Sequence, residues 1–184
     1  MQMSKCANET LKKAVALLLI TVLCTLIASA QKVIKVEKAS DHSTYIKGSN
    51  FEGVIFDKEY KFPYNVIDST YQRFTPTVEE IELVEKALKQ QIKELNKNHP
   101  NQISRKSNIE KHLGKYRRQY FGIITPKGER TIHVNCFKKE KDDDWQKSWM
   151  SNLYEVLDGG SNYWRVNFNI ATGVLFDFST NGVA

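Results

Sequence analysis

The chain has 184 residues and a formal net charge of +6, from 27 basic and 21 acidic side chains. Two of its three cysteines lie in the first 30 residues, so Cys136 is alone in the remainder, which excludes an internal disulfide there. The sequence has no CxxC pair, and its four histidines are scattered, so neither a structural nor a catalytic zinc site is indicated, and no cofactor is expected.

Residues 1–30 have the pattern of a secretory signal. Lys5, Lys12 and Lys13 precede an apolar run over residues 14–27, and Ala28-Ser29-Ala30 provides a small-residue cleavage site. The run is short for a membrane span of about 20 residues, although retention as an N-terminal anchor stays an alternative. We therefore expect an exported protein, periplasmic or secreted, with residues 31–184 as one domain and no membrane span after cleavage.

Residues 31–74 are predicted to be an irregular N-terminal part. The stretches 32–39 ("KVIKVEKA") and 51–57 ("FEGVIFD") are typical of short strands. Residues 61–74 are expected to form an irregular connector, because Pro63 disfavours a central strand.

One long helix is predicted over residues 75–95. Thr77 and Glu80 have the spacing of a capping box, and Pro100 ends the pattern. One face of this helix is an apolar stripe with helical spacing, formed by Ile81, Val84, Leu88, Ile92 and Leu95.

Four strands in two hairpins are predicted to follow the helix. The runs 116–125 and 130–139 are joined by "PKGE", and the runs 162–170 and 174–180 by "ATG". Between the hairpins, Trp145, Trp149 and Leu153 have the spacing of a short amphipathic helix.

The last two runs alternate, which predicts one apolar face and one mostly polar face. The apolar set is Trp164, Val166, Phe168 and Ile170 in one run and Val174, Phe176 and Phe178 in the next. The fold class is therefore α+β, with the helix on an antiparallel sheet of about four or more strands. This architecture is similar to cystatin-like and NTF2-like shapes, although fold alone does not determine function.

Three stretches also carry a resemblance at the level of sequence. They are "RFTPTVEEIELVEKAL", "YRRQYFGIITPKGERTIHVNCF" and "VLDGGSNYWRVNFNIATGVLFDFSTNGVA". Together they resemble a set of small uncharacterised exported bacterial proteins with a TPT-type helix start, a closing DGG–aromatic hairpin and an NG-A ending. The resemblance covers roughly residues 70–184 and implies no activity. The inhibitory segment of cystatins is not found, so protease inhibition is not implied.

A basic stretch over residues 86–118 is a candidate partner surface. It holds ten Lys or Arg and two Glu, which would attract a protein or an anionic envelope partner. A solvated helix face followed by a solvated loop is the alternative. The candidate ligand or partner residues are Lys89, Lys93, Arg105, Lys106, Arg117, Arg118 and Arg165. The mixture of aromatic and basic residues over 116–121 is compatible with nucleic acid, but an exported protein meets little of it.

A second candidate lies on the outward strand faces. If the hairpins are neighbours, His133 would lie near Arg165, Asn167 or Asp177, and a His–Asp pair can serve in acid–base chemistry. No serine or cysteine nucleophile is predicted beside it, because Cys136 shares the buried side of its strand. The acidic run 142–144 lacks the spacing of a calcium loop and is expected to cap the short helix.

The Asp158-Gly159-Gly160 stretch is expected to be a structural hinge before the third run. Glycine there supplies positive φ at a bulge or helix end, and Asp158 is expected to hold a turn amide. The sequence as a whole favours an exported, non-enzymatic binding or interaction protein. A small cavity hydrolase or isomerase that uses His133 and Asp177, and a structural envelope component, stay as alternatives.

Overall fold

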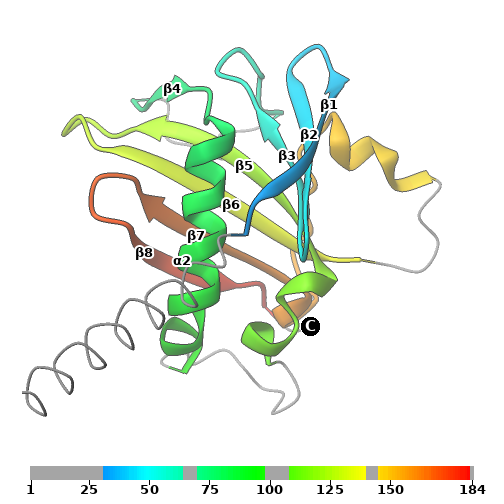
Figure 1. Cartoon of the computed structure of the whole chain (residues 1–184), viewed down its shortest axis with the longest axis vertical. Helices are drawn as coiled ribbons and strands as arrows, with labels where there is room; N and C mark the ends of the chain where they lie inside the picture. The colour runs from blue at the N-terminus through cyan, green and yellow to red at the C-terminus, as the bar shows by residue number, and fades with distance from the viewer. Residues whose placement is uncertain (1–30, 64–69, 98–107, 140–144, 183–184) are drawn as a thin grey trace, which may run out of the picture. The chain divides into compact units, whose positions relative to one another are not determined.

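The computed structural model describes residues 31–63, 70–97, 108–139 and 145–182 (Figure 1). The predicted signal, the acidic run 142–144 and Pro100 lie outside these ranges. Residues Gln31–Ala184 form one compact unit. Among the helices of the described residues, none is long and apolar enough to cross a membrane.

The unit is built on one mixed, mostly antiparallel sheet. The strands are β1 (Val33–Ser40), β2 (Ser43–Gly48), β3 (Glu52–Phe56), β4 (Gln72–Phe74), β5 (Tyr116–Ile124), β6 (Arg130–Lys138), β7 (Tyr163–Asn169) and β8 (Val174–Thr180). They follow the order β1-β2-β3-β5-β6-β7-β8, and β4 pairs with β5 beyond the end of β3. Among the strands of the described residues, only β3 and β5 pair in parallel. Both predicted hairpins, β5–β6 and β7–β8, are present.

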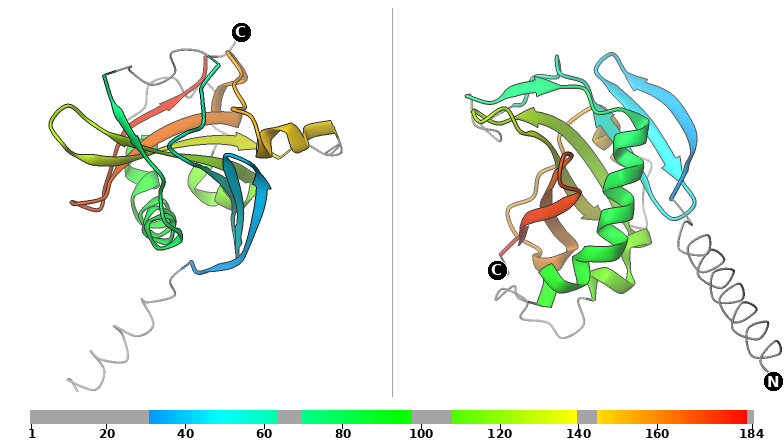
Figure 2. Two further views of the ribbon diagram at one scale, coloured as in Figure 1. Left: turned by 90° about the horizontal axis from the view of Figure 1, so that it is seen from above. Right: turned by 60° about the vertical axis from the view of Figure 1, so that its left-hand side comes forward.

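One long helix, α2 (Val78–Lys97), covers one side of this sheet, which we call the helix face (Figures 1 and 2). The predicted capping box is formed: the Thr77 amide donates to Glu80 Oε2 at 2.9 Å, and the Glu80 amide donates to Thr77 Oγ1 at 3.2 Å. The Gln91 side chain fixes the helix to the last hairpin, because it donates to the Gly173 carbonyl and accepts from the Leu175 amide. The α+β class expected from the sequence is therefore confirmed.

The predicted apolar stripe of α2 is buried, with Leu95 partly buried at its end. It packs on residues from β2 to β8, which join it in one apolar cluster. Trp164, Val166 and Phe168 of β7 lie in this cluster, as the alternation predicted. Burial of this stripe holds the helix on the sheet, because most of the stability of a protein helix comes from packing its apolar face rather than from the isolated helix.

The N-terminal part is more regular than the sequence suggested. The two expected strands are β1 and β3, but β2 was missed, as was the short strand β4 at the end of the expected connector. The β2 sequence "STYIKG" mixes small, polar and β-branched residues, and it gains its stability from pairing on both sides. The predicted helix between the hairpins is a 3-10 helix, Trp145–Met150.

The opposite side of the sheet, which we call the outer face, carries a second apolar cluster. Its buried members are Val54, Phe56, Phe121, Phe137 and Trp149. Phe56 and Phe121 stack with ring centroids 4.9 Å apart. The expectation of a sheet covered on one side was therefore wrong at this end, because the segment after the 3-10 helix folds back over β5 and β6.

The assignment of faces in β8 was also wrong. Leu175 and Phe178 are buried on the helix face, whereas Val174 is 50% exposed. A register shift between Arg165 and Asn167 inserts one extra residue into β8, and Asp177 there has a φ of 51°. A β-bulge reverses the alternation along a strand, and aspartate is one of the few non-glycine residues that tolerate positive φ.

Candidate functional site

Polar side chains gather on the outer face where β6, β7 and β8 lie side by side. His133 of β6 is directly opposite Asn167 of β7, and Asn135 is opposite Arg165. Arg165 in turn is opposite Ser179 of β8, and Arg165 Nε lies 3.0 Å from the Ser179 hydroxyl. The expectation that the two hairpins are neighbours is therefore confirmed.

His133 and Asp177 are joined through Asn167 rather than to each other. The Asn167 amide nitrogen donates to Asp177 Oδ2 at 3.4 Å, and Asn167 Oδ1 lies 2.8 Å from His133 Nδ1. A carboxylate can only accept hydrogen bonds, so the amide nitrogen of Asn167 must face Asp177. The amide oxygen of Asn167 then faces the imidazole. The imidazole must then donate from Nδ1, which leaves the lone pair of Nε2 as an acceptor.

The surroundings of His133 favour its neutral form. Loss of solvent lowers the pKa of His133 below its usual value of 6.5, and the positive charge of Arg165 acts in the same direction. The hydrogen bond with Asn167 opposes both but does not outweigh them. At neutral pH the imidazole therefore offers one donor, already used by Asn167, and one acceptor.

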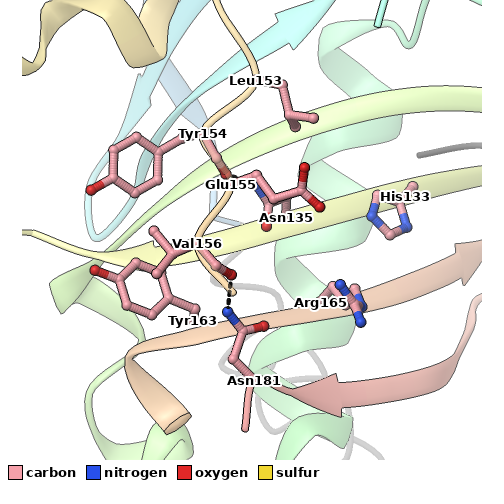
Figure 3. Close-up of a pocket in the computed structure, with 9 residues that line it drawn as sticks. All are labelled: His133, Asn135, Leu153, Tyr154, Glu155, Val156, Tyr163, Arg165 and Asn181. Carbon is pink, nitrogen blue, oxygen red and sulfur yellow. Dashed lines mark hydrogen bonds between the residues drawn. The ribbon is translucent and has the colours of Figure 1, made fainter. Parts of the chain in front are cut away.

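A cavity of about 290 Å³ opens beside these strands. A segment after the 3-10 helix, residues 153–156, forms its other wall (Figure 3). The lining residues are His133, Asn135, Leu153, Tyr154, Glu155, Val156, Tyr163, Arg165 and Asn181. In Figure 3 the imidazole and the guanidinium lie at one end of the cavity and the two tyrosine rings at the other. The cavity therefore has a polar end and an aromatic end.

Amide side chains hold the wall of the cavity in place. Buried Gln119 accepts from the Tyr154 amide at 2.9 Å and donates to the Trp149 and Asn152 carbonyls, both at 2.8 Å. Asn135 joins the same group, because its amide nitrogen donates to Gln119 Oε1 at 3.0 Å and to the Tyr154 carbonyl at 2.7 Å. These bonds satisfy the buried polar groups and fix the wall before any ligand binds.

Asn181 closes the far side of this wall. Its amide nitrogen donates to the Val156 carbonyl, and a second contact of 3.2 Å reaches the Asp158 carbonyl. Residues 156–158 are thereby tied to the end of β8.

The glycine pair before β7 is a structural corner, as predicted. Gly159 and Gly160 have φ values of 89° and 56°. A Cβ on Gly159 would lie 2.5 Å from the Tyr163 ring, so the position excludes larger residues. Asp158 contributes its carbonyl to Asn181, a different role from the expected bond of its side chain to a turn amide.

The predicted basic surface is not continuous. Lys89 and Lys93 are exposed on α2, and Arg105 and Lys106 lie outside the described residues. Arg117 and Arg118, which we expected at the surface, are 8% and 1% exposed. The prediction for these two arginines was wrong, because β5 is covered on both of its faces.

Each buried arginine has an acidic partner distant in sequence. Arg118 Nε lies 2.8 Å from Glu85 Oε1 on the helix face, and its other nitrogens donate to the Tyr116 and Leu113 carbonyls. On the outer face, Arg117 Nε lies 3.4 Å from Glu52 Oε1. The sequence held one signal of a buried basic partner: Glu85 directly follows Val84, a member of the apolar stripe of α2, and a buried carboxylate needs a partner of opposite charge.

Burial controls the protonation of the groups around Glu85. It raises the pKa of Glu85, against the lowering effect of Arg118 and of the Tyr120 hydroxyl, which donates to Glu85 Oε1 at 2.8 Å. Burial also raises the pKa of the Cys136 thiol, which is fully buried on the helix face. Cys136 is therefore a packing residue, as its place in the strand predicted.

Within the described ranges, no three His, Cys, Asp or Glu side chains gather closely enough to hold a metal ion. Comparisons with protein-family models, with curated proteins and with solved structures found no match.

Proposed function

We propose that this protein is an exported, non-enzymatic binding protein whose ligand site is the cavity on the outer face. The proposal rests on one observation: the cavity joins the Arg165 guanidinium, the acceptor nitrogen of His133 and two tyrosine rings behind a wall fixed by the amide side chains of Gln119 and Asn135. Binding sites typically combine apolar surface with a few convergent polar groups. A wall that is already ordered lowers the entropy lost on binding.

The chemistry of the lining suggests the ligand class. Apart from Nε, which contacts Ser179, the guanidinium of exposed Arg165 has no hydrogen bond among the described residues, so it suits a carboxylate or another small anion. Glu155 on the opposite wall supplies a negative charge for an amine. Tyr154 and Tyr163 lie with ring centroids 6.3 Å apart and would contact an apolar portion. We infer a small zwitterionic ligand, such as an amino acid or a short peptide end.

Two-dimensional ¹H–¹⁵N NMR titration with amino acids and dipeptides tests this assignment. Their C-terminal amides are the matched uncharged compounds. The carboxylates are expected to shift resonances of His133, Asn135 and Asn181, and the amides are expected to bind at least about tenfold more weakly, because a charge-assisted bond is lost.

Two variants complete the design. Arg165→Gln removes the proposed carboxylate partner, and Lys89→Gln removes an exposed positive charge of α2 far from the cavity lining. Loss of the shifts in Arg165→Gln alone supports the proposal. Equal binding to both variants, or no binding by any compound in the panel, would contradict it.

The catalytic alternative, a small hydrolase or isomerase, would use Nε2 of His133 as a base. Its support is the relay from Asp177 through Asn167. We favour binding because a neutral amide oxygen, rather than a carboxylate, contacts Nδ1. An imidazolium formed during proton transfer would therefore lack direct ionic stabilisation.

A protein or anionic envelope partner is a second candidate for the exposed face of α2. Lys89 and Lys93 are exposed one turn apart, as expected of a surface that meets an anion. Capture of a partner from envelope extract at low salt, lost at high salt and in the Lys89→Gln/Lys93→Gln variant, is the expected result. Capture that is unchanged in this variant would contradict a role for α2. A purely structural role in the envelope predicts neither small-ligand binding nor salt-sensitive capture.

A further inference from the structure

Strand β1 is an edge strand of the sheet, and its edge away from β2 is open to pairing. It pairs with β2 and ends the strand order of the described residues. The Gly48 amide donates to the Phe51 carbonyl, so the backbone N–H and C=O of Gly48 point toward β3. Because these groups alternate in direction along a strand, those of Thr44 and Ile46 also point toward β3, and those of Tyr45 and Lys47 point toward β1.

The same alternation identifies the backbone amides and carbonyls of β1 that point away from β2. Lys35 and Glu37 lie opposite Lys47 and Tyr45, so they bond to β2, and the backbone of Val36 and Lys38 faces outward. Val33 agrees with this pattern, because its outward amide donates to Glu82 Oε1 of α2 at 2.8 Å. Edge groups of this kind are a ready template for another strand.

The side chains of β1 also favour contact. Ile34 is 69% exposed and Val36 is 52% exposed, which makes them the most exposed large apolar side chains of the sheet among the described residues. Register shifts at Val33/Lys35 and Lys38/Ser40 confine the regular ladder to Lys35–Lys38. Bulges usually protect an edge, so any pairing here is short and its partner must fit closely.

The charges of β1 complement a second copy of the same strand. When two copies of one strand pair antiparallel about a two-fold axis, a given residue lies on the same face of the sheet in both copies. Directly opposite side chains must share a face, and faces alternate along a strand, so the residue numbers of two opposite residues must add to an even total. Within one copy Lys35 Nζ lies 2.8 Å from Glu37 Oε1. Centring on Val36 places Lys35 opposite Glu37 of the second copy, twice, so the same charges can also pair across the axis. Centring on Lys35 or Glu37 instead places like charges directly opposite, which is destabilising.

We propose that two copies of this chain pair through their β1 edges, antiparallel, with the two-fold axis at Val36. The outward Val36 amide and carbonyl of each copy then bond to those of the other. The two Lys35–Glu37 pairs lie at non-hydrogen-bonded positions, where side chains are closest. The occupant is a second copy because the residues that complement the edge are those of the edge itself. The cavity lies on β6 and β7, separated from β1 by β2, β3 and β5, so the dimer leaves it open.

Sedimentation velocity over a concentration series of the purified protein tests the proposal through a charge swap. Wild type is expected to form a reversible dimer. Glu37→Lys places lysine opposite lysine twice and is expected to weaken the dimer at least about tenfold. The double variant Lys35→Glu/Glu37→Lys restores opposite charges in the same register and is expected to dimerise like wild type.

A backbone variant tests the strand pairing itself. Val36→Pro removes an amide that points away from β2, so the fold is retained while the dimer is lost; Val36→Thr keeps the amide and dimerises. Circular dichroism of each variant checks the fold.

Three results would overturn the proposal: a wild-type monomer at every concentration, a Glu37→Lys dimer as strong as wild type, or no recovery in the charge swap. A monomer that instead binds a peptide strand of unrelated sequence would assign the edge to a foreign partner.

Discussion

Arg118 on the helix face of the sheet and Arg165 on the outer face lie in opposite environments. On the helix face, Glu85, Arg118 and Tyr120 are enclosed by apolar side chains. Glu85 forms an ion pair with Arg118 and accepts from the Tyr120 hydroxyl, and Arg118 donates to two backbone carbonyls. On the outer face, His133 and Arg165 line an open cavity, and Arg165 is exposed. Both faces therefore contain a basic group, but only the outer face presents one to a ligand.

This difference separates a structural site from a functional one. A buried ion pair is expensive to desolvate, and here it joins Glu85 of α2 to Arg118 of β5 inside the core. A partly exposed guanidinium with unused donors retains its capacity to bind. Substitution of the buried Glu85–Arg118 pair should therefore lower stability, and substitution of exposed Arg165 should lower binding. The predictions that follow test this division, from the largest effect to the smallest.

Arg118→Met should have the largest effect on stability. It leaves the Glu85 carboxyl buried without its ionic partner, and breaking such a pair costs about 3–5 kcal/mol. Urea denaturation measures the loss in free energy of unfolding. Glu85→Leu/Arg118→Met should recover most of it, because an apolar pair of similar volume leaves no unpaired charge. A single variant as stable as wild type would remove the distinction between the faces.

Gly159→Ala should be the next most damaging change. Positive φ costs a non-glycine residue roughly 1–2 kcal/mol, and the added methyl group meets the Tyr163 ring, which adds about 1–3 kcal/mol of overpacking. Gly173→Ala is the matched control, because Gly173 has a φ of 69° but no atom within 4 Å of the new Cβ. Equal losses in thermal denaturation for the two variants would contradict the role assigned to the Tyr163 contact.

Gln119→Leu should loosen the cavity wall at a smaller cost. It leaves the buried carbonyl of Trp149 and the carbonyl of Asn152 without their donor, a loss of about 1–3 kcal/mol. The Tyr154 amide also loses its acceptor, so its hydrogen exchange should accelerate more than that of amides in α2. Gln90→Leu, at an exposed position of α2, is the control. Unchanged exchange at Tyr154 would show that the wall is held by other contacts.

His133→Gln should change the pH dependence of stability by the smallest amount. The pKa of His133 is lowered in the folded protein, so below its usual value of 6.5 the unfolded chain takes up a proton that the folded chain does not. Wild-type stability should therefore fall as pH decreases from 6.5 toward the folded pKa, and the slope should be flatter in the variant. Urea denaturation at several pH values measures it. Parallel profiles would contradict a neutral His133.

The parts of the fold that were predicted correctly carry local signals. The capping box of Thr77 and Glu80, the apolar stripe of α2 and the glycine-containing turns all act over a few residues. Strand β2 and the parallel pairing of β3 with β5 were missed, because they depend on partners distant in sequence. The bulge at Asp177 was missed for a similar reason, since alternation gives no sign of an extra residue.

The candidate site was only partly accessible from the sequence. Alternation placed His133, Asn167, Arg165 and Asp177 together correctly, but not the order in which they bond. The wall over residues 153–156 was not foreseen, because its contacts to Gln119 and Asn181 require the tertiary fold. The burial of Arg118 likewise depends on Glu85 across the core.

The most direct test of the division between the faces is the map of NMR shift changes when a compound from the zwitterionic panel is added to wild type. The account predicts changes confined to the cavity lining, centred on His133, Arg165 and residues 153–156, with α2 unaffected. Changes centred on Lys89 and Lys93, or a response that persists in Arg165→Gln, would contradict it.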